Sequence, residues 1–222
     1  MGIKPIVTRS PLSPAGALCL DFANTAEWHA SDHPQEHLTS FAELLAWAER
    51  RGMFNEKVMR SLTQEAARLP QEAARVLRRA IELREALYQV FSRVARGQAV
   101  PRGALEQVND GVAESLSHTR LQPGANGFTW SWPDEVATLE RVLWPVMHSA
   151  AELLTSDRLA RVGQCQDDRG CGWLFIDTSR NHTRRWCAMG DCGNRAKARR
   201  HHQRALEFHL DTAGKRPARA RD

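Results

Sequence analysis

Four cysteines lie within 28 positions near the C-terminus, and they constrain the fold of that segment more than any other feature. Their spacing is Cys165-x5-Cys171-x15-Cys187-x4-Cys192. Structural zinc is bound tetrahedrally, and thiolate is its preferred ligand. Two close pairs separated by enough chain for a hairpin can supply all four ligands. We therefore predict one structural Zn²⁺ at these cysteines, with no open coordination position for catalysis.

Other uses of these thiols stay open at this point. His182 is at the tip of the expected hairpin, and His201 and His202 lie more than two helical turns after Cys192, yet a histidine can replace a cysteine in a zinc site. A disulfide redox switch is a further alternative. The fifth cysteine, Cys19, stands alone in the apolar stretch ALCLDFA, which favours a buried thiol.

The residues between the cysteine pairs favour a hairpin followed by a helix. WLFID, from Trp173 to Asp177, is strand-like, and TSRNHT supplies a polar turn. RRW, from Arg184 to Trp186, can return as the partner strand. Cys192 then opens a helix, with Asp191 or Cys192 itself at the cap. This order is typical of a treble-clef-like zinc finger.

The positive charge of the chain is confined to its C-terminal part. Residues 161–222 contain 14 Lys and Arg against 7 Asp and Glu, a balance of +7, whereas residues 1–160 contain 17 against 19, a balance of −2. A basic balance in one short segment indicates a polyanionic partner, above all nucleic acid. A solvated basic face that binds nothing in particular is the competing interpretation.

A helix over residues 195–209 divides into two sides at 100° per residue. One side is small or aromatic and is expected to lie on the zinc hairpin: Ala198, His201, His202, Ala205, Phe208 and His209. The other side is cationic, and two arginines of the expected hairpin flank it. Arginine suits bidentate contacts to phosphate or guanine. The candidate nucleic-acid contacts are Arg184, Arg185, Arg195, Lys197, Arg199, Arg200 and Arg204.

The first 160 residues show helical periodicity and helix-capping signals, with one pair of short alternating runs that predicts a β-hairpin. The fold class is thus mainly α: a helical N-terminal domain with one hairpin (1–160), a small zinc finger (161–211) and a disordered basic tail (212–222). Helices are expected over 40–51 with a Ser40–Glu43 capping box, over 55–69, from Pro70 to Gly97 and over 102–117. A further helix is expected from Pro133 to Thr155 with a kink at Pro145. The β-hairpin is expected over 117–132.

Several function classes lack their signatures here. There is no P-loop, Rossmann glycine pattern, nucleophile elbow or HExxH, so we expect no enzyme. A ligand pocket or enzymatic site around Asp21, Asn24 and Trp28 is the alternative. No membrane span and no secretory signal are found, which predicts a cytoplasmic protein.

Two stretches resemble known families. The string CGWLFIDTSRNHTRRWCAMGDCGNRAKARRHHQR resembles the CGNR zinc finger family, whose tetrapeptide is Cys192-Gly193-Asn194-Arg195 here. LCLDFANT (Leu18–Thr25) and LREALYQVF (Leu83–Phe91) resemble the helical ABATE domain. The resemblance implies a bacterial protein proposed to be a stress-induced transcription regulator, with zinc on the four cysteines and DNA as partner.

Partners beyond DNA are less defined by the sequence. RNA is the rival nucleic acid, for which Trp173 or Trp186 can stack on bases. A single small finger usually needs a second copy or another element for specificity, so the sequence leaves the oligomeric state open, with a homodimer through the helical domain as one alternative. A small-molecule effector is compatible with the same architecture, and no residue pattern supports it.

Overall fold

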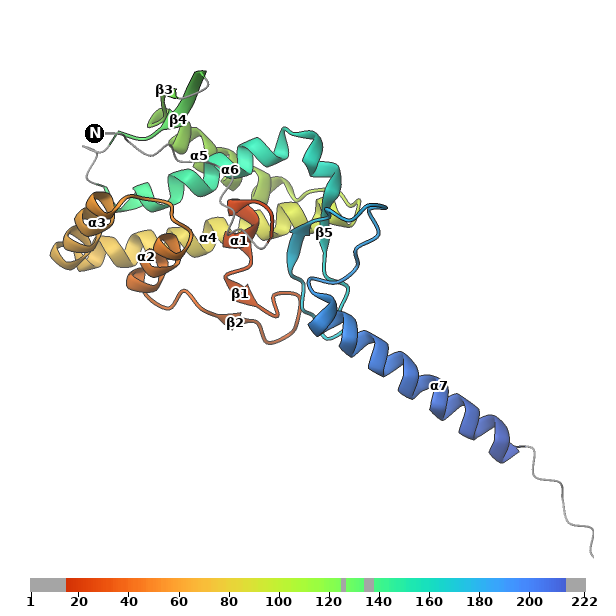
Figure 1. Cartoon of the computed structure of the whole chain (residues 1–222). Coiled ribbons are helices and arrows are strands. Elements are labelled where there is room, and N and C mark those ends of the chain that lie inside the picture. Colours follow the sequence, from red (N-terminus) through yellow and green to blue (C-terminus); the bar gives the residue numbers. More distant parts are fainter. Residues whose placement is uncertain (1–14, 125–126, 134–137, 215–222) are drawn as a thin grey trace, which may run out of the picture.

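The computed structural model describes residues 15–124, 127–133 and 138–214, with side chains as far as residue 204. The architecture is mainly α, as predicted, and three short antiparallel strand pairs accompany the helices (Figure 1). The helices are α1 (Leu18–Ala23), α2 (Phe41–Arg50), α3 (Glu56–Arg68), α4 (Pro70–Ala95), α5 (Arg102–Ser117), α6 (Trp144–Leu154) and α7 (Asn194–Gly214). The strand pairs are β1 (Ala26–Glu27) with β2 (Gln35–Glu36), β3 (Arg120–Gly124) with β4 (Gly127–Ser131), and β5 (Val162–Gln164) with β6 (Leu174–Ile176).

Helix boundaries follow the capping signals in the sequence. The Ser40 hydroxyl accepts a hydrogen bond from the backbone N–H of Glu43 at 3.2 Å, and α2 starts at the next residue after Ser40. Asn55 caps α3 in the same way, accepting from the N–H of Val58 at 2.9 Å. Each cap satisfies an N–H that has no partner within the helix. Both helices therefore begin where the sequence predicts.

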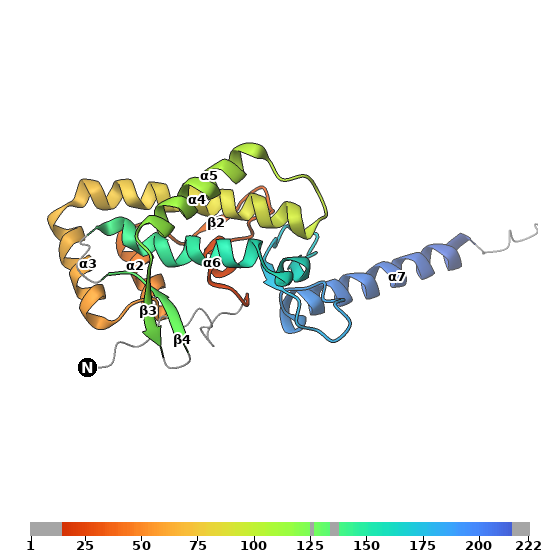
Figure 2. The ribbon, with the colours of Figure 1, turned by 90° about the horizontal axis from the view of Figure 1, so that it is seen from above.

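Helix α4 is the centre of the hydrophobic core. Its buried stripe packs against the short helix α1 and against α5, which lies beside it (Figure 2). Gly111 of α5 permits close packing, because a Cβ at this position would lie 2.9 Å from Met147 Cε of α6 and 3.1 Å from Leu83 Cδ2 of α4. The fully or almost fully buried residues of α4 include Val76, Ala80, Leu83, Leu87, Val90 and Phe91.

The segment before α6 differs from the prediction. A continuous helix from Pro133 with a kink at Pro145 is wrong: a 3₁₀ turn spans Leu139–Leu143, and α6 begins at Trp144. Residues 134–137 lie outside the description. Pro145 occupies the first turn of α6, where its missing N–H leaves no hydrogen bond unmade, so it causes no kink there.

The predicted hairpin over 117–132 is confirmed as β3 and β4. Leu121 pairs with Trp130, and Pro123 pairs with Phe128. Because directly opposed residues and residues two apart share one face, these four side chains form an apolar face. Leu121, Phe128 and Trp130 are exposed. This hairpin stands away from the helices α4 and α5 (Figure 2).

The C-terminal finger shares its core with the helical part. Val162 of β5 and Leu174 and Ile176 of β6 are buried in the same hydrophobic cluster as α1 and α4. Helix α7, in contrast, extends away from the rest of the molecule (Figure 1). None of the helices in the described part of the chain is long and apolar enough to cross a bilayer.

Candidate metal centre and basic helix

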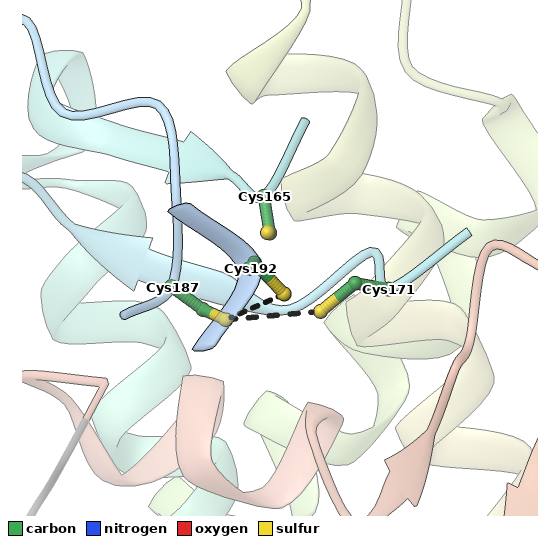
Figure 3. Close-up of side chains that lie close together, drawn as sticks. All are labelled: Cys165, Cys171, Cys187 and Cys192. Atoms are coloured by element: carbon green, nitrogen blue, oxygen red, sulfur yellow. Dashed lines mark hydrogen bonds between the residues drawn. The ribbon is translucent and has the colours of Figure 1, made fainter. Parts of the chain in front are cut away.

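The four clustered cysteines converge on one point. Their Sγ atoms all lie within 4.8 Å of one another, and they face a common centre (Figure 3). The Sγ atoms of Cys171 and Cys187 are 3.8 Å apart, and those of Cys187 and Cys192 are 3.4 Å apart. A tetrahedral zinc ion with Zn–S bonds of about 2.3 Å has S–S edges of about 3.8 Å. The sulfur positions therefore fit one zinc ion.

The first cysteine pair lies in the connection between β5 and β6. Cys165 follows β5 directly, and its N–H donates to the Trp173 carbonyl at 2.8 Å, which extends the hairpin by one bond. Gly170 and Gly172 on either side of Cys171 have φ values of 87° and 66°. These left-handed conformations favour glycine and let the loop turn back toward Cys165. Hairpin geometry thus brings the first two sulfurs together.

The second pair flanks a turn at the start of α7. Cys187 precedes, and Cys192 lies within, a π-type turn over Met189–Gly193 that leads directly into the helix. The N–H of Gly193 donates to the carbonyl of Ala188 at 3.0 Å. A Cβ at position 193 would lie 2.8 Å from the sulfur of Met189. This turn connects the second cysteine pair directly to the first residue of α7.

One element of the expected finger is wrong. Arg184–Trp186 is not a strand, and the partner of β6 is β5 on its other side in the chain. The carbonyl of Arg185 accepts one isolated hydrogen bond from the N–H of Gln166 at 2.9 Å. The Arg184 side chain instead lies over the Phe175 ring and donates to the Trp186 and Cys187 carbonyls. The hairpin-plus-helix order is retained with a different strand pairing.

Among the four sulfurs, the mutual contacts favour thiolate at Cys165 and raise the pKa of the Cys171 and Cys187 thiols, while burial raises the pKa of the Cys192 thiol. Hydrogen bonds from the thiols of Cys171 and Cys187 lower the pKa of Cys165 far below its usual range. The Arg195 guanidinium donates to Cys192 Sγ at 2.9 Å. Four thiolates around a divalent ion carry a net formal charge of −2, and this guanidinium offsets part of it. Zinc bound here is fully coordinated by protein, so its contribution is structural.

The histidine alternatives lie outside the centre. Within the described residues, the group able to hold a metal consists of the four cysteines alone. His182 is exposed in the turn after β6, and His201 and His202 are exposed on α7. Cys19 belongs to α1 and is fully buried beside Ser149 of α6, and this burial raises its pKa to about 12. It is a neutral core thiol, as the apolar stretch predicts.

The side of α7 that was expected to pack on the zinc hairpin does not do so. Ala198, His201 and His202 do not pack on the hairpin; they are exposed, and Ala196 in the first turn is buried instead. The side chains of Ala205, Phe208 and His209 fall outside the described part. A helix side made of small and aromatic residues is buried only where another element packs on it. After its first turns α7 extends away from the other helices and strands, so no such element is present there among the described residues (Figure 1).

Four of the seven candidate nucleic-acid contacts are exposed. Lys197, Arg200 and Arg204 lie on α7 with their side chains in solvent. Arg185 is exposed at the base of the finger, where its Nε donates to Gln166 Oε1 at 2.7 Å and its guanidinium lies 5.2 Å from the Trp186 ring centroid. These groups remain accessible to a polyanion.

The other three candidates are half-buried and engaged within the protein. Arg184 makes the carbonyl contacts described above. Arg199 pairs with Asp168 at 2.5 Å and with Asp167 at 3.5 Å. Arg195 pairs with Asp167 at 3.3 Å and with Asp191. The structure thus divides the cationic residues of the finger into an outward set and an inward set.

Asp167 is the residue at this site that sequence reasoning missed. Its side chain is 0% exposed. Burial opposes its ionisation, yet the N–H and side chain of Arg169, the Cys192 thiol and the Arg195 side chain lower its pKa to about 2. The signal available in the sequence was a carboxylate between Cys165 and Cys171, in a segment whose later residues include many arginines. It joins the first cysteine pair to α7.

The alternative ligand pocket was expected around Asp21, Asn24 and Trp28, whereas the groove found in the structure is lined by other residues. The Asp21 carboxylate accepts from the N–H of Ala15 at 3.0 Å, and the Asn24 amide bonds to the backbone of Leu174. An open groove of about 820 Å³ runs instead between residues 30–33 and the finger. Its walls mix both charges: Asp32, His33, Arg96, Arg161, Asp168 and His182.

Comparison with protein families agrees with this geometry. One family model, ABATE, described as "Putative stress-induced transcription regulator", matches residues 16–157. A second, the CGNR zinc finger, matches residues 161–205 and contains all four cysteines. A search of curated proteins finds no match. The chain therefore belongs to the ABATE family and carries a C-terminal CGNR zinc finger, whose four cysteines form the site of one structural zinc ion.

Proposed function

We propose that this zinc-binding protein is a DNA-binding transcription regulator that contacts nucleic acid through α7. The observation that carries the proposal is the outward set on this helix. Lys197, Arg200 and Arg204 are exposed and follow one another at spacings of three and four residues. Such spacing places them on one side of a helix. A row of cations on a projecting helix suits the regular phosphates of a duplex.

The inward set fixes the start of α7 to the rest of the finger. Arg195 and Arg199 attach the first two turns of α7 to the acidic residues Asp167, Asp168 and Asp191. Their charge is largely compensated, so we assign direct phosphate contacts to Lys197, Arg200, Arg204 and Arg185. The family description as a regulator supports the same function.

The salt dependence of binding tests this assignment. With four phosphates neutralised, log affinity for a labelled duplex of mixed sequence falls against log salt with a slope of about −3 to −4. The double variant Arg200→Ala, Arg204→Ala reduces the magnitude of this slope by about 2. The control double variant Arg60→Ala, Arg102→Ala removes two exposed arginines of the helical part. An equal slope for all three proteins excludes Arg200 and Arg204 from the interface and contradicts the assignment.

RNA is the second candidate ligand. Trp173 and Trp186 are half-buried, which leaves part of each ring available to a base. Competition of unlabelled single-stranded RNA, duplex RNA and duplex DNA of matched length against the labelled duplex separates the ligands. Preferential displacement by duplex DNA supports the regulator, and preferential displacement by RNA assigns the finger to RNA.

The remaining features of the proposal follow from the same architecture. We assign the chain no catalytic activity, because four thiolates complete the coordination of zinc. We place it in the cytoplasm, where a reducing environment preserves thiolates. We also propose a homodimer through the helical part, because one small finger offers few base contacts. Sedimentation velocity over a concentration series distinguishes dimer from monomer.

A further inference from the structure

The loop between β1 and β2 connects the helical part to the start of α7. The guanidinium carbon of Arg169 lies 5.0 Å from the Trp28 ring centroid, and that of Arg195 lies 5.4 Å from it. Both distances are within the range of cation–π attraction. Trp28 belongs to the family-matched helical segment, whereas Arg169 and Arg195 belong to the finger. One indole ring therefore contacts the cysteine loop and the first turn of α7.

The backbone of Trp28 indicates that its position is imposed by these surroundings. Its φ is 54°, a left-handed conformation that is unfavourable for a bulky residue. Such a conformation persists where neighbouring contacts fix it, and it is commonest at functional sites. The next residue, His29, anchors the loop on α4: its ring stacks on Tyr88 with centroids 3.6 Å apart, and Nε2 lies 2.8 Å from Glu85 Oε2.

The other side of the loop is fixed to the finger. The N–H of Ala30 donates to the Gly170 carbonyl at 3.1 Å. The approach is too close for a side chain: a Cβ at position 170 would lie 2.5 Å from the Cα of Ser31, and one at position 172 would lie 2.7 Å from the Cβ of Ala30. The cysteine loop and the β1–β2 loop are thus in direct backbone contact beside Trp28.

Asp167 completes the connection on the side of the finger. Its Oδ2 lies 3.3 Å from Arg195 Nε, and its Oδ1 accepts from the N–H of Arg169 at 3.0 Å. The same carboxylate therefore holds both arginines that lie over Trp28. Because it is fully covered, its pairing is protected from solvent screening. We call Trp28, Asp167, Arg169 and Arg195 the docking cluster.

We infer that the docking cluster sets the direction of α7 relative to the helical part, and that Arg195 is a positioning residue within it. Arg195 contacts Trp28, Asp167 and the zinc ligand Cys192 at once. A rearrangement of the β1–β2 loop therefore reaches the first turn of α7 directly through this side chain. The helical part thereby controls how α7 is presented to a partner. The consequence for DNA rests on the proposed function, whereas the docking itself does not.

The direction of α7 is measurable without nucleic acid. Two spin labels on introduced ketone side chains, replacing Arg60 in α3 and Gln203 in α7, report the distance between body and helix in the zinc-loaded protein. The wild-type background gives one narrow distance distribution. Trp28→Leu broadens it while zinc stays at one ion per chain, and Trp28→Tyr, which retains an aromatic face, keeps it narrow. A narrow, unshifted distribution in Trp28→Leu overturns the inference.

Two further variants keep the test decisive if Trp28→Leu does not fold. Arg195→Lys keeps the charge beside Asp167 and loses the planar guanidinium over Trp28, so it also broadens the distribution. Arg102→Lys, the same change at an exposed position of α5, leaves it narrow. An equal distribution in both lysine variants refutes the role of Arg195.

DNA binding gives a readout that separates positioning from direct contact. If α7 binds DNA, Arg195→Lys weakens affinity by roughly three- to tenfold through lost preorganisation and leaves the salt slope unchanged. A smaller slope identifies Arg195 as a phosphate contact and contradicts its positioning role. If no duplex binds, the proposed function fails while the distance measurement still decides the docking cluster.

Discussion

Asn24 and Leu174 are joined by two hydrogen bonds across 150 residues of sequence. The Asn24 Nδ2 donates to the Leu174 carbonyl, and its Oδ1 accepts from the Leu174 N–H, both at 2.9 Å. Asn24 follows α1 in the ABATE segment, and Leu174 begins β6 in the zinc finger. The amide thus acts as an additional partner for the edge of β6. The finger and the helical part are consequently one packed structure rather than two independent modules.

Asn24→Ala is expected to destabilise the whole chain. The substitution leaves the buried N–H and carbonyl of Leu174 without these partners, which costs about 2–4 kcal/mol. Urea unfolding of the zinc-loaded protein, followed by both circular dichroism and tryptophan fluorescence, measures the loss. Asn109→Ala, at an exposed position of α5, serves as control and changes the free energy of unfolding by less than about 0.5 kcal/mol. Equal stability of the two variants contradicts the shared structure.

A pair of glycine substitutions tests the contact between the two loops. Gly170→Ala places a Cβ 2.5 Å from the Cα of Ser31 at a φ of 87°, and it lowers the free energy of unfolding by about 1–3 kcal/mol. Gly103→Ala, in α5 with no atom within 4 Å of the new Cβ, raises it by about 0.5–1 kcal/mol. The two changes have opposite signs if the structure is right, and denaturant titration determines both.

Zinc content separates the cluster from the core thiol. Cys192→Ser removes one of four thiolate ligands and reduces zinc to well below one ion per chain after dialysis against a weak chelator. Cys19→Ala alters a buried neutral thiol outside the cluster and retains one zinc ion. Elemental analysis of the reduced, purified proteins gives both numbers. Loss of zinc from the Cys19 variant alone disproves the assigned ligand set.

The ion pair between Glu36 and Arg84 gives a pH dependence. Both Glu36 oxygens accept from the Arg84 guanidinium at 2.6 Å. Partial burial opposes ionisation of Glu36, but the bonds from Arg84 and from the Leu38 N–H lower its pKa below 4.5. The stabilisation is therefore present above pH 4.5 and is lost as the pH falls through the folded-state pKa.

Glu36→Gln removes this titration. At neutral pH the variant is less stable than the wild type by about 0.5–1 kcal/mol, a value appropriate to a carboxylate that is one-third exposed. The gap closes as the pH falls below 4.5, because the wild-type carboxyl also becomes neutral. Parallel denaturant titrations across this pH range check it. If the difference in free energy of unfolding between wild type and variant stays constant with pH, the lost stability comes from packing and not from charge.

Local rules predicted the parts of the fold that depend on neighbours in sequence. The caps at Ser40 and Asn55 and the stripe on α4 each require only nearby residues, so α2 to α4 were found. The four cysteines were found because tetrahedral thiolate coordination has few sequence solutions. The continuation of α5 through Gly111 was predicted without its cause, which is the close approach of Met147 from another helix.

Long-range pairing accounts for what the sequence did not reveal. The strand Val162–Gln164 is too short to show alternation, so Arg184–Trp186 was wrongly chosen as the partner of β6. The 100° periodicity divides α7 into two sides but does not show whether a partner surface exists, which is why Ala198 was misplaced. Asp167 and Trp28 come to share Arg169 and Arg195 only after the finger packs on α4, and no local pattern indicates this arrangement.

The central claim is that a zinc ion on four thiolates holds a cationic helix in position to bind nucleic acid. Its most direct test is the anisotropy of a labelled duplex titrated with zinc-loaded protein, then with added chelator, then with zinc restored in excess. Binding that is salt-dependent, lost on zinc removal and recovered on zinc addition is the predicted result. Affinity that does not change when the zinc is removed, or no affinity for the duplex at low salt, contradicts the claim.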